Sequence, residues 1–556
     1  MKGLLQKLDR WLRLPDHEQG NRWCNEDTLP VPPERQVWGP LQFIELWFVI
    51  FTNLSNYQTG SSLMASGLLY WQAILVIIIG NILGASFAVL NSVSGAASHI
   101  GFPIASRSVW GMWGSYFPIL NRILLSLVWY GVQAVLGGKM LYVCLRSIWP
   151  HIEHGIPNHL PASIGLTSAQ FVCYFLFNIL ALVFIWIRPH KIRVWFHYTA
   201  VIISLSLFVL LGWAVGTSKG WGEVITAKST ISHSELGWTM SAGVMSVIGS
   251  ISAGILNQND FTRFAKKPSH VTWSQAGSFF LASNITSIIG VIVTAATQKE
   301  YGHGKALWDP TQLFMAIQDQ HGSRGRAAAF FLGLVFIISQ LGINVVGNVL
   351  AGGLDVAAVL PKYINLRRGA YTIAVLSVLP NPWQQLASGS TFLAVLSAYA
   401  VFLGPMIGLL CVHYYIIQKR TFHFPDLYTG NKKSIYWYTW GVNWRTVIVW
   451  IIAIIPSFPG FVNDANHALP VPIGLTRVYS LSFVLGFLIA VVLALLLHWI
   501  FPENFPERTE LERQQDLYGT DIYFDYERQL GHSRGPSNDE SEKKDNARTA
   551  VTRVDE

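Results

Sequence analysis

The chain has few charged residues: Asp, Glu, Lys and Arg make up only 13% of its 556 residues, while hydrophobic residues make up 51%. A soluble fold cannot hide that much apolar surface behind so few charges. Its four cysteines have neither paired nor metal-ligand spacing, so we expect no disulfide framework and interpret them as apolar fillers. The composition therefore predicts an all-α polytopic membrane protein.

Motifs of catalysis and of nucleic-acid binding are also missing. The sequence contains no metal cluster, phosphate-binding loop or catalytic triad, and no basic face with interleaved aromatic residues. We therefore expect no enzyme, cofactor, metal site or nucleic-acid partner. One alternative stays open, a membrane-embedded enzyme with a polar intramembrane site. Cells with such an enzyme would contain an altered product, whereas cells with a transporter would accumulate the unaltered substrate.

Both ends of the chain are polar. Residues 1–40 are polar and basic, so we expect a cytoplasmic tail and no cleavable signal peptide. Residues 502–556 are rich in charge, which predicts a disordered cytoplasmic tail. These tails are candidate contacts for trafficking machinery, although any polar tail has this composition.

Between the tails lie twelve apolar segments, each about the 20 residues that cross a bilayer of about 30 Å. The predicted spans are 41–64, 68–93, 117–145, 168–187, 197–216, 238–258, 274–296, 327–351, 371–389, 391–417, 443–461 and 476–500. Span nine is the least regular because Pro380 and Pro382 interrupt it.

Loop cations predict the orientation. With the amino terminus inside, the inner loops hold 16 Lys and Arg residues and the outer loops hold 8. Because inner loops carry the excess of cations in membrane proteins, we expect both termini in the cytoplasm. The segment 156–161 and the loop 298–326 would then cap the outer side.

The spans suggest two related halves within a transporter domain of residues 41–501. Span one carries polar residues from Thr52 to Thr59 in an apolar context, and span six ends in a polar run. Five spans separate these segments, which is the spacing of inverted repeats that meet at the bilayer midplane. We predict repeat one at about 41–216, repeat two at about 238–417 and two extra helices at about 443–500.

The segment 243–263 of span six is predicted to be discontinuous. Gly249 and Gly254 would loosen the helix, and four polar residues, Asn257 to Asp260, follow. Broken helices mark substrate sites in transporters, which makes Ser250 and Ile251 candidate binding residues. The alternative is a kinked helix with a polar cap at its cytoplasmic end.

Two pairs of side chains are candidates for a substrate site because they lie four residues apart on one helix face. Trp129 could stack on a flat ring while Gln133 bonds its edge, or the two could fill a helix interface. Asn344 and Asn348 in span eight could likewise bind substrate or join neighbouring helices.

Many motifs in the same order resemble the nucleobase-cation-symport-1 family, and within it the fungal branch that carries uracil, uridine, allantoin and thiamine. The resemblance extends over about residues 20–500. The motifs are NRWCNEDTLPVPPERQVWG, YWQA, GFPIASRSVWG, VWYGVQA, IPNHLPASIG, NQNDFTRFA, the Asn-rich run of span eight with PKYINLRRG after it, LAVLSAY and YTWGVNWR.

This resemblance implies a LeuT-like fold of ten core helices plus two that works by alternating access. It also implies that Trp129, Gln133 and Asn348 hold the substrate. Sodium-coupled members have a Ser-Thr pair where Gly342 and Ile343 stand here, and neither of these side chains can ligate a hard cation. We therefore expect coupling to a proton.

The proton-carrying residue has more than one candidate. Many fungal relatives carry an acid where Ile50 stands, and Glu45 is the nearest substitute. A carboxyl in an apolar span could carry a proton, or it could be an interfacial carboxylate. Asp260 presents the same choice, with Arg263 one turn on as a structural ion-pair partner.

In the resemblance, relatives that transport uracil often have a Lys where Ala242 stands and an aromatic residue at about Ile251. Both are missing here, so the sequence does not predict uracil itself as the substrate. The wall opposite Trp129 must then come from Phe392 or Tyr399 of span ten, as a candidate gate, or be aliphatic.

Together, these features predict a plasma-membrane symporter that imports a small planar heterocycle, such as a nucleobase, a nucleoside, allantoin or thiamine, with protons. The alternative of the same fold is a sensor that binds substrate without transporting it.

Overall fold

The computed structural model describes residues 12–15, 21–161, 164–187, 189–218, 231–466, 469–503 and 505, and of residues 189–197 only the backbone. Nearly all of the predicted tail 502–556 lies outside the described residues, and so do Lys219 and Lys228 of the predicted outer loops. Regular secondary structure in the described ranges is helical, apart from two isolated bridges.

The helices follow one another with short connections. They are α2 (Pro40–Phe51), α3 (Leu54–Ala65), α4 (Tyr70–Ser98), α5 (Phe102–Trp110), α6 (Tyr116–Ile148), α7 (Ile152–Gly155), α8 (Ser168–Ile185), α9 (Pro189–Thr217), α10 (His233–Leu256), α11 (Gln258–Thr262), α12 (Pro268–Thr297), α13 (Pro310–Ile343), the π-helix η5 (Asn344–Val349), α14 (Leu350–Val359), α15 (Leu366–Leu376), α16 (Gly389–Val412), the π-helix η7 (His413–Ile417), α17 (Phe424–Leu427), α18 (Trp444–Ile454), α19 (Phe458–Ala465), α20 (Ile473–Tyr479) and α21 (Ser482–Ile500).

The polytopic helical architecture is confirmed, and the number of spans is confirmed in part. In the described part of the chain, nine helices are long and apolar enough to cross a membrane, and a tenth span results if α18 and α19, bent by 58°, count as one. The predicted span 41–64 consists of two 12-residue helices, and in the predicted span 371–389 the helix α15 has only 11 residues. The predicted outer loop 298–326 is largely helical, because α13 begins at Pro310 and kinks at Gly322.

The break in the middle of a span lies in span one and not at the glycines of span six. Thr52 (φ −82°, ψ 66°) and Asn53 (φ −141°, ψ 171°) separate α2 from α3. In contrast, α10 is continuous through Leu256 and is interrupted only at Asn257, which begins the polar cap formed by α11. The segment 243–263 is therefore interrupted, as predicted, but at Asn257 and not at Gly249 or Gly254.

Gly249 instead permits close packing of two helices. A Cβ atom at this position would lie 2.0 Å from the carbonyl oxygen of Leu396, so α10 and α16 meet backbone to backbone. Any side chain here would push the helices apart, because such a contact is far inside van der Waals distance. The glycine thus fixes the distance between α10 and α16 and does not loosen α10.

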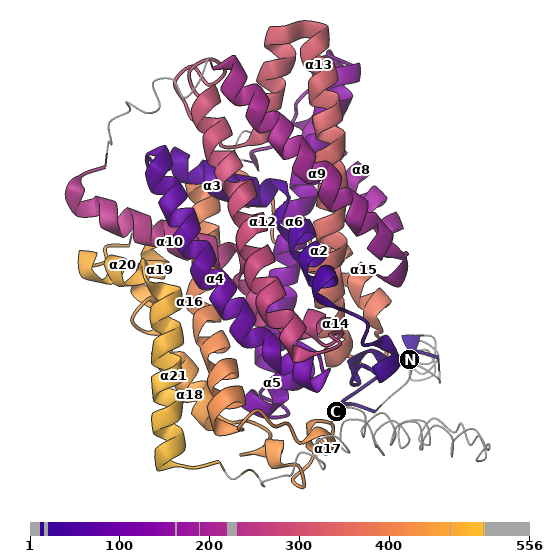
Figure 1. Cartoon of the computed structure of the whole chain (residues 1–556), viewed down its shortest axis with the longest axis vertical. Helices are drawn as coiled ribbons and strands as arrows, with labels where there is room; N and C mark the ends of the chain where they lie inside the picture. The colour runs from indigo at the N-terminus through magenta and orange to yellow at the C-terminus, as the bar shows by residue number, and fades with distance from the viewer. Residues whose placement is uncertain are drawn as a thin grey trace.

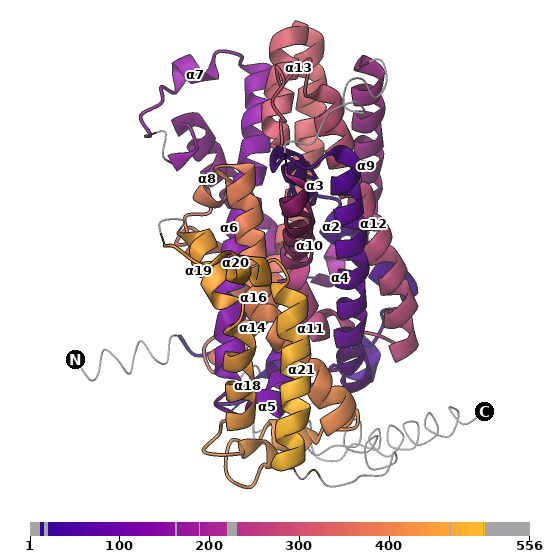
Figure 2. The same ribbon diagram turned by 90° about the vertical axis from the view of Figure 1, so that its left-hand side faces the viewer.

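The helices form one elongated bundle (Figure 1). We call its two ends the α17 end, where α5 and α17 lie, and the α13 end, where the first half of α13 projects. The pairs α6 with α13, α4 with α12 and α10, and α16 with α21 make extensive contacts. The helices α18 to α21 stand together on one side of the bundle (Figure 2).

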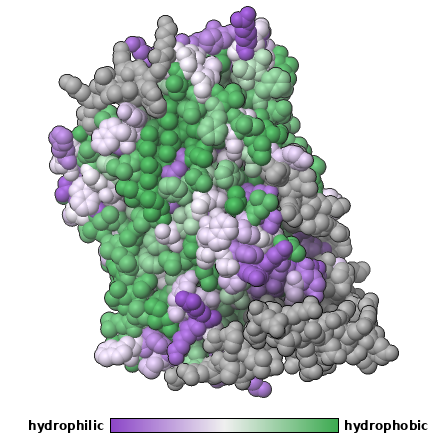
Figure 3. Space-filling view, viewed as in Figure 1, coloured by the Kyte–Doolittle hydropathy of each residue, from purple (hydrophilic) through white to green (hydrophobic). Residues whose placement is uncertain are grey.

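Apolar side chains cover much of the outer surface. Figure 3 shows hydrophobic residues over much of the visible face between the two ends. On α8, for example, Phe175, Ile179 and Val183 are 49%, 60% and 61% exposed. Large apolar side chains in such positions face lipid in a membrane protein.

Residues 21–38, which belong to the predicted amino-terminal tail, pack against the α17 end. The guanidinium of Arg107 donates to the carbonyl oxygens of Trp23 and Leu427, and Arg263 donates to the carbonyl oxygen of Asp27. This segment is therefore bonded to the bundle and is not a free tail.

Three of the 16 cations counted in the predicted inner loops are buried in the bundle. Arg107, Arg122 and Arg263 are 2%, 3% and 7% exposed. Arg107 and Arg263 donate hydrogen bonds to backbone carbonyl oxygens, and Arg122 lies 3.6 Å from the carboxylate of Asp355. These three cations therefore do not lie in loops that could sense membrane charge. The remaining predicted inner cations still outnumber those of the predicted outer loops, but by a smaller excess. The orientation of the termini stays a prediction.

Candidate functional site

An internal cavity, which we call the chamber, lies where the broken first span meets three other spans, namely α6, α10 with α11, and α13 with η5. Its volume is about 70 Å³, which is room for several water molecules. The lining residues come from α2, α3, α6, α10, α11, Ile343 at the end of α13 and η5. They are Trp47, Ile50, Phe51, Asn53, Ser55, Asn56, Thr59, Arg122, Trp129, Gln133, Ser250, Ile251, Ala253, Gly254, Asn257, Phe261, Ile343, Gly347 and Asn348.

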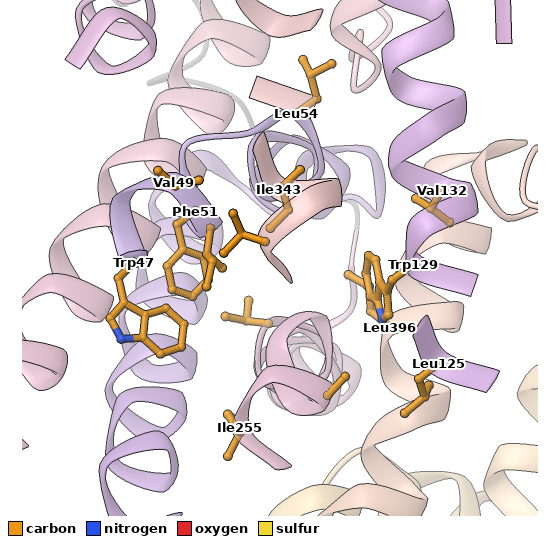
Figure 4. Close-up of a cluster of buried hydrophobic side chains, with 14 of the residues drawn as sticks. Trp47, Val49, Phe51, Leu54, Leu125, Trp129, Val132, Ile255, Ile343 and Leu396 are labelled. Atoms are coloured by element: carbon orange, nitrogen blue, oxygen red, sulfur yellow. The ribbon is translucent and has the colours of Figure 1, made fainter. Parts of the chain in front are cut away.

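Aromatic side chains stand on opposite sides of the chamber. Trp129 projects from α6, whereas Trp47 and Phe51 project from α2, with Ile343 and the end of α10 between the two groups (Figure 4). Trp47 is fixed because its indole nitrogen donates to Gln275 Oε1 at 2.9 Å and its ring stacks on Phe51 at 5.3 Å. The wall opposite Trp129 is thus both aromatic and aliphatic.

Gln133 connects α6 to the far half of the broken span. Its Nε2 donates to Ser55 Oγ at 2.7 Å, and Ser55 Oγ donates to Asn53 Oδ1 at 2.7 Å. The other amide atom, Gln133 Oε1, is buried and has no hydrogen-bond donor within the described residues. A buried acceptor without a partner is costly unless a ligand or water supplies the donor.

Asn344 and Asn348 lie in the π-helix η5, which interrupts the regular helix between α13 and α14. Asn348 Nδ2 donates to Asn344 Oδ1 at 2.9 Å, and Asn344 Nδ2 contacts the carbonyl oxygen of Tyr130 at 3.4 Å. Asn348 lines the chamber, whereas Asn344 is fully buried behind it. Asn344 is therefore in position to orient Asn348 and does not reach the cavity itself.

Residues from α10 complete the chamber. Ser250 and Ile251 line it, as the sequence predicted, and Ser250 Oγ donates back to the carbonyl oxygen of Val247 at 2.7 Å. Asn257, at the interruption between α10 and α11, also lines it, and its Oδ1 is buried without a donor in the described part of the chain.

The backbone groups freed by the break in span one are bonded by the protein itself. Asn53 Nδ2 donates to the carbonyl oxygen of Ile50, and Ser339 Oγ donates to that of Thr52 at 2.7 Å. Asn53 Oδ1 accepts from the backbone of Asn56 at 2.9 Å and so caps α3. Side-chain donors thus bond two of the carbonyl oxygens that the break frees.

Arg122 and two carboxylates form a charged group toward the α17 end of the chamber. Arg122 lines the cavity, and its Nε lies 3.6 Å from Asp355 Oδ2, with both side chains buried. Neither carboxylate oxygen of Asp355 has a hydrogen-bond donor within the described residues. Asp260 is better satisfied, since it accepts from the backbone of Phe102 at 2.8 Å and from Asn257 Nδ2 at 3.2 Å.

The other predicted site residues lie outside the chamber lining. Glu45 is half-buried on α2, and Asp260 lies behind Asn257. Phe392 is buried and stacks on Trp308 at 6.1 Å, away from the lining, while the Tyr399 ring lies 6.4 Å from the Trp129 ring. The structure therefore brings together Trp129, Gln133, Ser250, Ile251 and Asn348. Their binding role and the gate role of Phe392 and Tyr399 stay predictions.

Sequence reasoning missed three charged residues. Arg122 was counted as a loop cation, and Asp355 and Lys139 were not considered. Lys139 Nζ lies 2.8 Å from Asp309 Oδ2 in a buried ion pair between α6 and the start of α13. The available signal was a charged residue inside an apolar run, as in LAGGLDVAAV around Asp355 and LGGKMLYV around Lys139.

Comparison with known proteins identifies related sequences over most of the chain. A family model described as "Permease for cytosine/purines, uracil, thiamine, allantoin" matches residues 30–486. The chain is 36% identical to the allantoin permease of Saccharomyces cerevisiae over 484 residues, which are 86% of this chain and 76% of that protein. It is 32% identical to the uracil permease of the same organism, over 83% of this chain and 74% of that protein.

Among solved structures, the inward-facing conformation of Mhp1 is similar to this chain with a TM-score of 0.70. The match extends over 90% of this chain and 99% of that chain at 21% sequence identity. At this identity the likeness concerns the fold alone, and the fold is that of the Mhp1 and LeuT class of helical transporters.

Proposed function

Because this chain belongs to the nucleobase-cation-symport-1 family of permeases for cytosine/purines, uracil, thiamine and allantoin, we propose that it imports a neutral planar heterocycle together with protons. The family consists of transporters, so the protein is a permease and not an enzyme. In the proposal, twelve helices cross the plasma membrane, both termini are cytoplasmic, and the α17 end of the bundle faces the cytoplasm.

One observation carries the proposal: the indole of Trp129 and the amides of Gln133 and Asn348 line the same chamber beside a broken span. An indole offers a flat apolar face for stacking, and amides offer directed hydrogen bonds to a ring edge. Such a combination suits a small aromatic or ureido ring.

The free amide atoms support a more specific class of substrate. One N–H of Gln133 Nε2 and one of Asn348 Nδ2 are engaged by Ser55 and Asn344, and we propose that the carbonyl oxygen of each amide accepts from the substrate. A ligand that matches two acceptors must bring two N–H donors. Cyclic ureas and imides, such as pyrimidine-diones and hydantoin rings, have such groups, and we propose them as substrates ahead of thiamine.

Transport requires the chamber to open. A cavity of about 70 Å³ is smaller than the roughly 300 Å³ at which ordinary ligand pockets begin. We propose that α2 and α3 move about Thr52 and Asn53 when the chamber opens to one side and then to the other. Breaks of this kind serve as hinges because few backbone bonds resist the motion.

A proton is proposed as the coupling ion. The carbonyl oxygens of Ile50 and Thr52 already accept hydrogen bonds from Asn53 and Ser339. Gly342 and Ile343 stand where the sodium-coupled relatives have hydroxyl side chains. Since sodium needs several oxygen ligands, this donor set supports a sodium-independent transporter.

Asp355 is proposed as the proton-carrying residue ahead of Glu45 and Asp260. Its carboxylate is fully buried, has no hydrogen-bond donor within the described residues and lies 3.6 Å from an arginine that lines the chamber. A buried carboxylate of this kind changes its charge readily when its cationic partner moves. Substrate-linked movement of Arg122 would thus couple proton release to transport.

The test is uptake of radiolabelled uracil, uridine and allantoin, each competed with the others and with thiamine, in cells that lack such transporters. We expect saturable uptake that a protonophore abolishes and that replacement of sodium by choline leaves unchanged. Binding to the purified protein without uptake would favour the sensor alternative, and sodium dependence would contradict proton coupling.

A further inference from the structure

A second cavity lies at the α17 end, outside the chamber. Its volume is about 290 Å³, and residues of four segments surround it: the amino-terminal segment, the end of α8, the stretch from η5 to α14, and the start of α15. Its lining includes Asn25, Glu26, Ile185, Val345, Val349 and Arg367. This volume approaches that of ordinary ligand sites.

The two cavities share the π-helix η5 as a wall. Gly347 and Asn348 of η5 line the chamber, whereas Val345 and Val349 line the second cavity. π-Helical turns are rare and are frequent at functional sites. A ligand in the second cavity would therefore press directly on the segment that carries Asn348.

The polar half of the second cavity combines both signs of charge. Glu26 supplies a carboxylate, and Arg367 supplies a guanidinium whose Cζ lies 4.8 Å from the centroid of the Trp186 ring. The carboxylate of Asp27 accepts from the backbone of Leu366 at 2.7 Å. Within the described residues, Glu26 forms a loose and exposed ion pair with Arg35, at 3.8 Å. Opposite charges held apart in this way match a ligand that is itself zwitterionic.

An unsatisfied acceptor also points to a ligand with N–H donors. Asn25 is 1% exposed, and its Nδ2 is bonded to the carbonyl oxygens of Pro361 and Ile364 at 3.4 and 3.0 Å. Its Oδ1, in contrast, is buried without a donor among the described residues. Since buried amide oxygens are normally bonded, an ammonium group entering the cavity would satisfy it.

The other half of the cavity is apolar and adjoins the lipid-facing surface. Ile185, Ile187 and Val349 line it, and Ile187 is 39% exposed at the end of α8. This helix presents the exposed apolar side chains described above, and it ends in Trp186, which is 65% exposed. A tryptophan at the end of such a helix is typical of the membrane interface. The cavity therefore meets the bilayer at headgroup depth.

We propose that this cavity binds a phospholipid whose zwitterionic headgroup carries a primary amine, that is, a phosphatidylethanolamine. The phosphate pairs with Arg367, and the ammonium lies between Asn25 and the carboxylate of Glu26. The glycerol and the first acyl carbons pack on Ile185 and Val349. A choline headgroup lacks N–H donors, and a glycerol headgroup lacks the cation, so both bind less well.

The test uses the full chain released from micelles that contain equal amounts of phosphatidylethanolamine, phosphatidylcholine and phosphatidylglycerol, with bound lipid counted by native mass spectrometry. We expect one phosphatidylethanolamine to be retained in preference to the other two. Arg367→Gln should lower its retention roughly tenfold, the ratio expected for a lost bond to a charged group. Glu26→Gln should lower it by a smaller factor.

Arg368→Gln is the matched control, because Arg368 is the next residue of α15 but bonds the carbonyl oxygens of Leu12 and Tyr363 and does not line the cavity. Equal loss in Arg367→Gln and Arg368→Gln, or no preference among the three lipids, would overturn the proposal. Displacement of the lipid by equimolar O-phosphoethanolamine would also overturn it, since the site would then belong to a soluble ligand. None of these measurements depends on transport.

Discussion

The side-chain amide nitrogen of Gln133 lies 2.7 Å from Ser55 Oγ, so the residue expected to hold the substrate is bonded across the chamber to the broken span. This bond engages one N–H of the amide, whereas Gln133 Oε1 has no donor within the described residues. It also means that any motion of α3 changes the position of Gln133. Substrate recognition and the opening of the chamber are thus joined in one pair of side chains.

Removal of the Ser55 hydroxyl tests the pairing of Ser55 with Gln133. Ser55→Ala leaves Gln133 Nε2 without its partner, and we expect the KM for uptake to rise by roughly fivefold to tenfold, since one hydrogen bond contributes about 1 kcal/mol. The double variant Ser55→Ala with Gln133→Ala should be no worse than Gln133→Ala alone, because the two residues act as a unit.

Ser66→Ala serves as its control, because Ser66 is the C-cap residue of the same helix and its hydroxyl donates to the nearby carbonyl oxygen of Leu63, away from Gln133. Its KM should equal that of the wild type. Fully additive effects of Ser55 and Gln133 in a double-mutant cycle would show that the two residues contribute separately.

Loss of the Asn348 amide should abolish uptake. Asn348→Ala removes an acceptor that lines the chamber while leaving the apolar contacts of η5 in place, so we expect at least a roughly tenfold fall in uptake at an unchanged surface level. Surface protein is measured by biotinylation. Asn178→Ala is the control, since Asn178 is a half-buried amide of α8 bonded to Tyr174. Normal uptake by Asn348→Ala would remove it from the site.

Neutralisation of Asp355 should uncouple uptake from the proton gradient. Asp355→Asn cannot release a proton, so we expect uptake that varies little between pH 5 and pH 8 and resists a protonophore. Asp319→Asn is the control, because that carboxylate is 63% exposed and pairs with Arg146. If Glu45→Gln flattened the pH profile and Asp355→Asn did not, the proton would reside on Glu45.

The buried pair of Lys139 and Asp309 should matter for stability. Lys139→Met leaves a buried carboxylate uncompensated, which costs about 3–5 kcal/mol, so the midpoint of thermal unfolding in detergent should fall markedly. The pair of Arg146 and Asp319 offers a comparison with the same distance, 2.8 Å, but partial exposure. Arg146→Met should cost about 1 kcal/mol or less. Equal effects of the two variants would contradict the burial argument.

Much of the architecture could be predicted from the sequence because the bilayer imposes a length and an apolar composition on each span. The helices α4, α6, α8, α10, α12 and α16 lie within a few residues of the predicted spans. The pairs Trp129 with Gln133 and Asn344 with Asn348 followed from helical spacing, although only Asn348 of the second pair reaches the chamber.

The location of the helix breaks could not be predicted in the same way. Glycines in α10 suggested flexibility, but Gly249 is required by the backbone of Leu396 on another helix. The polar run of span one, in contrast, breaks because Asn53 and Ser339 supply donors for the freed carbonyl oxygens. Ser339 is 287 residues from Thr52, whose carbonyl oxygen it bonds, so local sequence carries no sign of its contribution.

The sequence by itself determined that this protein is a helical permease, because hydropathy and motif order are properties of the chain that need no partner in space. Tertiary structure alone decided which polar groups are satisfied. Whether Arg122 is a loop cation or a buried partner of Asp355, and which atom of Gln133 is free, depends on side chains from distant helices. The physical reason is that burial and hydrogen bonding depend on the side chains that surround a residue. Helix packing brings those side chains together from distant parts of the chain.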